Sequence, residues 1–175
     1  MTLITDEWLV ALEKPAPAPC LYILCGLAFA GKSTLVREMV MRSAGRLALV
    51  SLDAINGESG LGLDGRRILP AEWDMTYAEA YRRIGVLLAE GRSVIFDATS
   101  FTRRQRDELR AIAAPYNAAT QVIYVTTPEA VARERLHRNR EMGSRADVRD
   151  DDFALVVDAL EPPGPNESPL LYDAL

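Results

Sequence analysis

Four short, largely apolar runs mark the chain and are separated by segments with helical periodicity. The runs have the length of strands and occupy residues 20–25, 47–52, 93–98 and 120–126. Strands that are buried on both faces have this unbroken character, because no alternate residue faces water. In the segment 32–43 the apolar residues recur instead one and four positions apart, as on one face of a helix. This alternation predicts an α/β fold with a parallel sheet between helices.

Further helices are expected between and after the strands. They cover 71–91, 102–116, 128–143 and 150–160, and a short amphipathic helix within 5–14 precedes a proline-rich linker at 15–19. Pro128 suits a first helical position, since proline is common there. The glycine-rich segment 54–70 lacks a clear period, and long loops of this kind are often functional. The last residues, LLYDAL, are expected to add an edge strand and complete a five-stranded sheet.

Composition narrows the class of protein. The chain has 175 residues, of which 49% are hydrophobic and 26% charged, and this suits one globular domain. We expect an N-terminal helix and linker over 1–19 and the main domain over 20–175. A net charge of −5 disfavours a protein that coats nucleic acid. Neither a basic leader nor an apolar run of membrane-spanning length is evident, so a cytoplasmic protein without a membrane partner is expected.

The stretch GLAFAGKST, residues 26–34, follows the first apolar run and opens a helix. Gly26, Gly31, Lys32 and Ser33 match the spacing G-x-x-x-x-G-K-[ST] of a phosphate-binding loop. The glycines permit backbone angles at which successive N–H groups turn toward an anion. Lys32, one of only two lysines in the chain, supplies a compact charge that arginine replaces poorly. The alternative is a glycine-rich turn that binds nothing.

The whole loop is expected to contact the nucleotide. Its residues are Gly26, Leu27, Ala28, Phe29, Ala30, Gly31, Lys32, Ser33 and Thr34. The Ser33 hydroxyl is a Mg²⁺ ligand in loops of this kind.

Two aspartates follow later strands. Asp53 ends the run LALVSL, where a carboxylate near the γ-phosphate could accept a proton from an attacking hydroxyl. A carboxylate that caps a turn or helix is the alternative for this residue. Asp97 ends the run SVIF, and an apolar strand closed by aspartate resembles the second Mg²⁺-site element of phosphate-loop enzymes.

The segment VARERLHRNRE is rich in arginine. A lid over about 133–148 could place Arg138, and to a lesser degree Arg135, against charge that develops on a transferred phosphoryl group. The alternative is a solvated helix in which each arginine pairs with a neighbouring glutamate. His137, the single histidine, is expected on the surface of this helix.

Together these motifs resemble a group of phosphate-loop kinases that includes polynucleotide kinases, zeta-toxin-like kinases and chloramphenicol phosphotransferases. GLAFAGKST carries the most specific likeness, and SLDAIN resembles the strand whose aspartate is the general base, which falls here on Asp53. VIFDATSFTRRQR resembles a V-I-V-D-A-T-N segment followed by arginine, with Ser100 in place of the usual asparagine. RERLHRNR resembles the lid, and ALEPPGPNE resembles a C-terminal ending of some members.

The resemblance implies ATP, Mg²⁺ held by Ser33 and Asp97, and transfer of the γ-phosphoryl group to a hydroxyl. It leaves the acceptor open, and the acidic net charge favours a small molecule over nucleic acid. The rivals are a polynucleotide 5′-hydroxyl kinase and a nucleotide-dependent switch that acts through a protein partner. The oligomeric state is not indicated.

Overall fold

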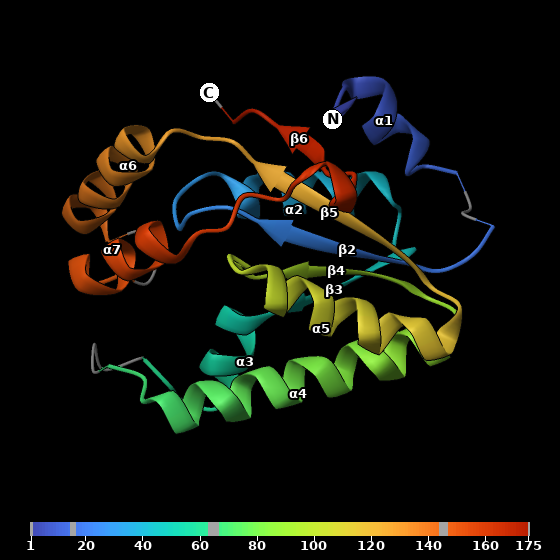
Figure 1. Cartoon of the computed structure of the whole chain (residues 1–175), viewed down its shortest axis with the longest axis horizontal. Coiled ribbons are helices and arrows are strands. Elements are labelled where there is room, and N and C mark those ends of the chain that lie inside the picture. The colour runs from blue at the N-terminus through green and yellow to red at the C-terminus, as the bar shows by residue number, and fades with distance from the viewer. Residues whose placement is uncertain (1, 15–16, 63–66, 144–146, 175) are drawn as a thin grey trace.

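One parallel sheet organises the computed structural model of the chain, which describes residues 2–14, 17–62, 67–143 and 147–174. Within these residues six strands lie in the order β1-β6-β5-β2-β4-β3 (Figure 1). Their bounds are β1 (Thr2–Leu3), β2 (Cys20–Cys25), β3 (Leu47–Ser51), β4 (Ser93–Asp97), β5 (Ala119–Val125) and β6 (Leu170–Tyr172). Every neighbouring pair is parallel. The α/β prediction is therefore confirmed, with one strand more than expected.

Seven α-helices and two short 3₁₀ turns fall within the described residues. The helices are α1 (Asp6–Ala11), α2 (Lys32–Arg42), α3 (Leu52–Glu58), α4 (Pro70–Ala89), α5 (Arg103–Ala113), α6 (Glu129–Met142) and α7 (Asp150–Ala159). The 3₁₀ turns are η1 (Ala114–Tyr116) and η2 (Pro165–Glu167). Pro128 caps α6 from outside and is not its first helical residue, contrary to the expectation from sequence.

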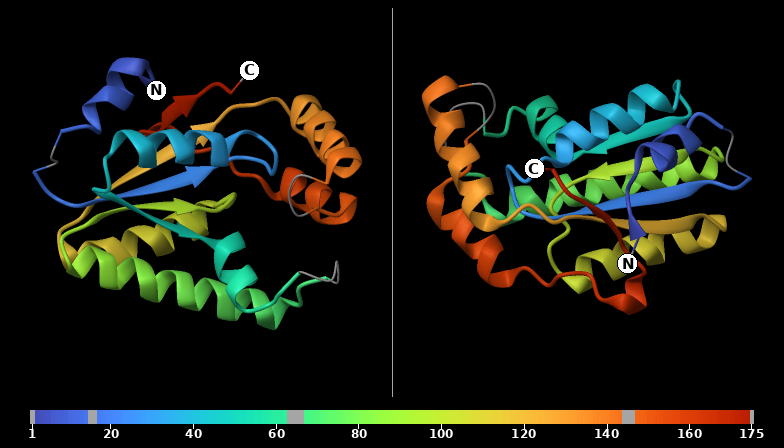
Figure 2. Two further views of the ribbon diagram at one scale, coloured as in Figure 1. Left: turned by 180° about the vertical axis from the view of Figure 1, so that it is seen from behind. Right: turned by 90° about the horizontal axis from the view of Figure 1, so that it is seen from above.

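Helices cover both faces of the sheet, as the two views of Figure 2 show. Alternate residues of β2 enter different cores, because successive strand side chains point to opposite faces. Leu21 and Ile23 join the core beneath α4 and α5, whereas Leu24 joins the core beneath α1 and α2. A third apolar cluster lies beyond the carboxyl ends of the strands and joins the loop after β2 to α6 and α7. The third cluster thus packs against the loop where it leaves the sheet.

The N-terminal segment takes part in the sheet. Thr2 and Leu3 pair with Leu170 and Leu171, so β1 is the edge strand and β6 lies inside it. The expectation of β6 as the edge of a five-stranded sheet was therefore wrong. Leu9 of α1 is buried in the core on the α2 face, and α1 lies beside β6 in Figure 1. Two residues of strand carry too little periodicity for sequence to reveal them.

The segment after β3 begins as a helix. We expected an irregular loop over 54–70, but α3 starts at Leu52 and continues to Glu58. Ser51 is its N-cap, with the hydroxyl accepting a hydrogen bond from the N–H of Ala54 at 3.4 Å. The glycines in and after this short helix hide its period, and residues 63–66 of the expected loop lie outside the described residues.

Candidate active site

The loop between β2 and α2 adopts a backbone that a side chain at its glycines would disrupt. Gly26 and Gly31 have φ angles of 142° and 107°, and Phe29 is left-handed at 61°. A Cβ on Gly26 would lie 2.9 Å from the carbonyl oxygen of Val125. A Cβ on Gly31 would lie 2.7 Å from the Cβ of Ala174. Both glycines are therefore required by close approach as well as by φ.

Lys32 turns back into this loop. Its side chain is buried, and Nζ donates hydrogen bonds to the carbonyl oxygens of Gly26 at 3.0 Å and Leu27 at 2.6 Å. The hydroxyl of Thr127 also donates to the carbonyl oxygen of Ala30 at 2.6 Å. A buried ammonium encircled by the loop, at the N-terminal end of an eleven-residue helix, concentrates positive potential where an anion would bind.

Ser33 and Asp97 meet beside the loop. The Ser33 hydroxyl donates to Oδ2 of Asp97 at 3.3 Å, and both side chains are half-buried. One comes from the first turn of α2 and the other from the last residue of β4. Hydroxyl and carboxylate oxygens are the hard ligands that Mg²⁺ prefers, so this pair fits such an ion. The sequence assigned these two residues to one site, and the structure brings them together.

Asp53 lies in the first turn of α3, the helix that directly follows β3, and β3 is the neighbour of β4 in the sheet. Ser51 is the register partner of Asp97, so Asp53 follows that position by two residues at the same edge of the sheet. The helix that carries it is held by a buried contact, in which Thr76 Oγ1 of α4 donates to Asn56 Oδ1 at 2.6 Å. The exposed Asp53 carboxylate is thus presented by the first turn of a helix, not by the strand end expected from sequence.

The lid arginines differ sharply in position. Arg135 reaches the phosphate-binding loop, where its guanidinium donates to the carbonyl oxygens of Ala30 at 3.4 Å and Ala174 at 2.7 Å. Arg138 lies on an exposed face and pairs with Glu134 at 2.7 Å, as the solvated-helix alternative anticipated for it. His137 is exposed. Arg135 therefore lies against the phosphate-binding loop and Arg138 does not, whereas the sequence analysis put Arg138 first.

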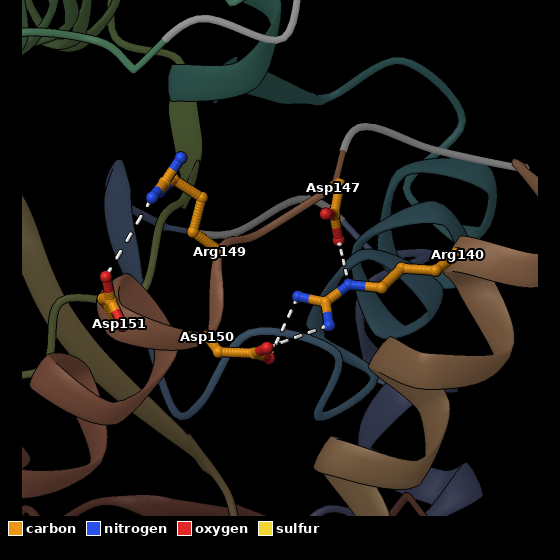
Figure 3. Close-up of a pocket in the computed structure, with 5 residues that line it drawn as sticks. All are labelled: Arg140, Asp147, Arg149, Asp150 and Asp151. Atoms are coloured by element: carbon orange, nitrogen blue, oxygen red, sulfur yellow. Dashed lines mark hydrogen bonds and ion pairs between the residues drawn. The ribbon is translucent and has the colours of Figure 1, made fainter.

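The other two arginines of α6 are engaged around α7. Arg133 bonds Glu129 at 2.6 Å and lies 4.9 Å from the ring centroid of Phe153. Arg140 bonds Asp147 and Asp150 at the rim of a polar cavity of about 270 Å³ (Figure 3). Residues 144–146 of the expected lid lie outside the described residues.

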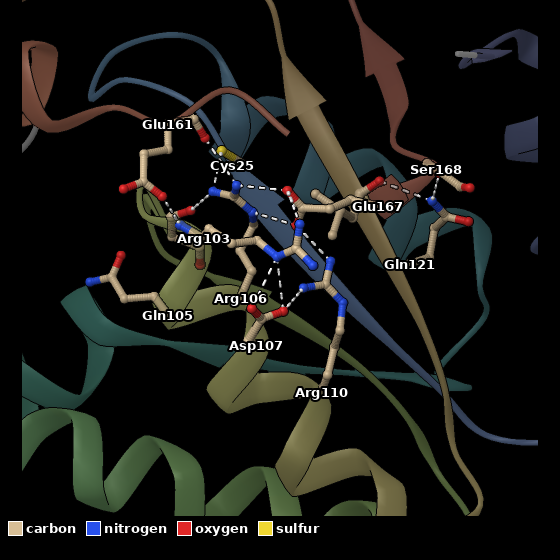
Figure 4. Close-up of polar contacts among 12 residues, drawn as sticks. Cys25, Arg103, Gln105, Arg106, Asp107, Arg110, Gln121, Glu161, Glu167 and Ser168 are labelled. Carbon is tan, nitrogen blue, oxygen red and sulfur yellow. Dashed lines mark hydrogen bonds and ion pairs between the residues drawn. The ribbon is translucent and has the colours of Figure 1, made fainter. Parts of the chain in front are cut away.

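A buried ion pair that the sequence analysis did not assign lies behind the site. Arg106 of α5 bonds both carboxylate oxygens of Glu167, each at 2.9 Å, and both side chains are almost fully buried (Figure 4). Burial pushes the pKa of Glu167 upward, but hydrogen bonds and charge from Arg106 and Arg110 outweigh it and hold the pKa at about 2. In the sequence, the only sign of this pair was that RRQR, which contains Arg106, and PPGPNE, which ends at Glu167, resemble segments of the kinase group. That resemblance assigned neither residue a role.

A known family model matches most of the chain. The family model AAA_33, an AAA domain, matches residues 21–163. The chain belongs to this AAA domain family. The match spans the phosphate-binding loop, both aspartates and α6, which agrees with the expected phosphate-loop kinase group. No curated protein matches the chain significantly.

Solved structures share the AAA domain's fold. Kti12 of Chaetomium thermophilum in complex with ADP-AlF3 is 23% identical, with a TM-score of 0.68 and 87% of each chain covered. A chain of the Pnkp1/Rnl/Hen1 RNA repair complex is 20% identical at a TM-score of 0.70, covering 84% of this chain and 45% of that chain. The Mycobacterium tuberculosis APS kinase in complex with AMPPNP and APS is 16% identical at 0.60, covering 91% and 90%. Identities this low establish the shared fold and not the reaction.

Among the described residues, no helix of this AAA domain is both long and apolar enough to cross a membrane.

Proposed function

We propose that this protein is an ATP-dependent kinase that transfers the γ-phosphoryl group to a hydroxyl of a small molecule. The contact between Ser33 and Asp97, beside a loop that encloses Lys32, is the observation that carries the proposal. Phosphoryl transfer requires Mg²⁺ ligands at the end of the phosphate-binding loop, and this contact supports that role for Ser33 and Asp97. The kinase-like fold of the matched structures supports the same class of reaction.

The residues divide the work of transfer. The loop N–H groups and Lys32 bind the β- and γ-phosphates, while Ser33 and Asp97 hold the metal ion. Mg²⁺, when bound, neutralises charge on the phosphate oxygens. Asp53 takes the proton from the acceptor hydroxyl as its oxygen bonds to the γ-phosphorus. The bond from that phosphorus to the bridging oxygen of ADP breaks, and Arg135 stabilises the charge on the transferring group.

A small acceptor fits the charges around the site better than a polynucleotide does. Phosphate backbones are bound by unpaired basic side chains, whereas Arg133, Arg138 and Arg140 of α6 each bond a carboxylate. The first turn of α7 is acidic and consists of Asp150, Asp151 and Asp152. A polynucleotide would meet this acidic turn unfavourably. The RNA repair complex among the similar structures keeps the polynucleotide alternative worth testing.

A nucleotide-dependent switch is the second candidate, and one contact favours it. Arg67, in the segment before α4, bonds Asp152 of α7 at 2.6 Å. This exposed ion pair links the segment after Asp53 to the helix packed beside the lid. A change at the γ-phosphate that moved either segment would break the pair, and a protein partner could read the difference.

A phosphate-transfer screen separates these functions. Purified protein is incubated with labelled ATP and Mg²⁺ and with nucleosides, sugars, aminoglycosides or oligonucleotides. We expect transfer to a small hydroxyl compound and its loss in Lys32→Ala. Lys14→Ala, which removes the chain's other lysine, is the matched control and should retain full transfer. Labelled oligonucleotide would instead support the polynucleotide kinase, and slow ATP hydrolysis with no labelled acceptor would support the switch.

A further inference from the structure

The guanidinium of Arg106 bonds atoms of three separate segments. Besides Glu167, it donates to the carbonyl oxygens of Ser100 at 3.0 Å, Phe101 at 3.3 Å and Glu161 at 3.0 Å. Its Nη1 also lies 3.7 Å from Sγ of Cys25. An arginine has five N–H donors in a rigid fork, and here Nε, Nη1 and Nη2 are all engaged. Figure 4 shows the side chain extending from α5 toward β2 and the C-terminal segment.

Two of these three segments adjoin the candidate active site directly. Cys25 directly precedes Gly26, the first residue of the phosphate-binding loop. Ser100 and Phe101 close the turn that begins at Asp97, and the N–H of Gly26 donates to the carbonyl oxygen of Thr99 at 3.2 Å. The loop and the turn therefore share a hydrogen bond of their own, and Arg106 is bonded on both sides of it.

The C-terminal segment completes this connection. Glu161 and Glu167, both bonded to Arg106, precede β6, and the residues after β6 reach Ala174. The carbonyl oxygen of Ala174 accepts the hydrogen bond from Arg135. Through Glu161 and Glu167, the buried Arg106 guanidinium thus also holds the C-terminal segment, whose Ala174 carbonyl is bonded by Arg135.

The Asp97–Phe101 turn contains a residue in an unfavourable backbone conformation. Ser100 has a φ angle of 37° and is 2% exposed. Its Oγ is, among the described residues, the one buried side-chain polar atom without a hydrogen-bond partner. A left-handed conformation is unfavourable for a residue other than glycine. The hydroxyl offers no compensation, so the conformation depends on hydrogen bonds to backbone carbonyls of the turn, which include the bond from Arg106 to the Ser100 carbonyl and the bond from the Glu161 N–H to the Phe101 carbonyl at 2.9 Å.

We propose that Arg106, oriented by Glu167, is a positioning residue that fixes the position of the Asp97–Phe101 turn relative to the phosphate-binding loop. We call this effect the registration of the two segments. Its effect is to keep the Asp97 carboxylate within reach of the Ser33 hydroxyl. A buried ion pair adds little net stability compared with apolar side chains of the same volume, whereas the planar fork sets direction. The metal-binding consequence rests on the proposed kinase function, and the registration of the two segments does not.

Arg106→Lys tests this, because lysine keeps the charge and loses the fork. Arg110→Gln is the matched control. Arg110 bonds Oε2 of Glu167 at 2.6 Å, an oxygen that Arg106 also bonds, but its other partner is Asp107 on its own helix. Hydrogen exchange at the Gly26 amide should become about tenfold faster in Arg106→Lys, relative to amides of α2, and stay normal in Arg110→Gln. Normal exchange in Arg106→Lys, or an equal change in both variants, would overturn the registration.

The second readout is the Mg²⁺ concentration that gives half-maximal ATP binding by calorimetry. We expect it to rise about tenfold in Arg106→Lys, as loss of a supporting contact does for metal ligands, and to stay unchanged in Arg110→Gln. A wild-type protein that binds no ATP would defeat the proposed function and the metal consequence with it. The exchange measurement needs no nucleotide and still decides the registration. Should Arg106→Lys not fold, Glu167→Gln is measured by the same two readouts with the same expected results.

Discussion

The hydroxyl of Ser33 and the carboxylate of Asp97 lie 3.3 Å apart, although 64 residues separate them along the chain. Their helix and strand converge because β2 and β4 are parallel neighbours, so the segments after both strands leave the sheet at the same edge. A hydroxyl and a carboxylate at this separation can share one cation in place of the hydrogen bond. The relationship turns two separate sequence motifs into one candidate metal site.

Asp97→Asn should weaken the response to Mg²⁺ more than binding of the nucleotide itself. Asparagine keeps the shape and an oxygen but removes the charge that attracts the ion. We expect the half-saturating Mg²⁺ concentration for transfer to rise about tenfold or more, by comparison with losses of supporting contacts at metal sites. Titration of transfer with Mg²⁺ at saturating ATP measures this. An unchanged titration would remove Asp97 from the metal site.

Asp53→Asn should act on the acceptor step. If Asp53 takes the acceptor proton, the amide leaves Mg²⁺-ATP affinity near normal and lowers transfer by roughly 10²-fold or more. Calorimetry with Mg²⁺-ATP and the rate with the acceptor from the screen provide the two numbers. A shifted Mg²⁺ dependence in this variant, with Asp97→Asn normal, would exchange the roles of the two aspartates.

Arg135→Ala and Arg138→Ala form a matched pair three residues apart on α6. Arg135 bonds the phosphate-binding loop, whereas Arg138 has an exposed i,i+4 pair with Glu134. Loss of Arg135 should lower kcat by about 10²-fold, as removal of one transition-state donor does, with a smaller change in the KM for ATP. Arg138→Ala should keep nearly full kcat. Equal effects in both variants would contradict the assignment.

Glu167 should govern stability in acid. Its folded pKa of about 2 lies below the ordinary value of 4.5, so within that window the unfolded chain binds a proton that the native chain does not. The free energy of unfolding should then fall as pH drops from about 4.5 to about 2, by about 1.4 kcal/mol per pH unit for this one proton. Glu167→Gln should lack this contribution. Denaturant unfolding of both proteins across the window measures the difference, and parallel curves would refute it.

The local pattern along the chain was sufficient for the parts of the fold that depend on neighbours in sequence. The four apolar runs became β2, β3, β4 and β5, because a strand buried on both faces leaves no polar alternation. Residues 26–34 could be recognised for a related reason. The glycine positions, the lysine and the hydroxyl of a phosphate-binding loop all lie within nine residues, so one short stretch carries the requirements of backbone and charge.

Contacts between distant segments decided the rest. Sequence placed Arg135 and Arg138 on one helix, but the packing of α6 against the loop turns Arg135 inward and leaves Arg138 exposed. Arg106 and Glu167 are 61 residues apart, and each looks like an ordinary surface charge until the fold buries them together. Helical and strand periods follow from the chain's own geometry and are legible locally. The partner of a buried charge is set by which strands lie side by side, and only the tertiary structure supplies that.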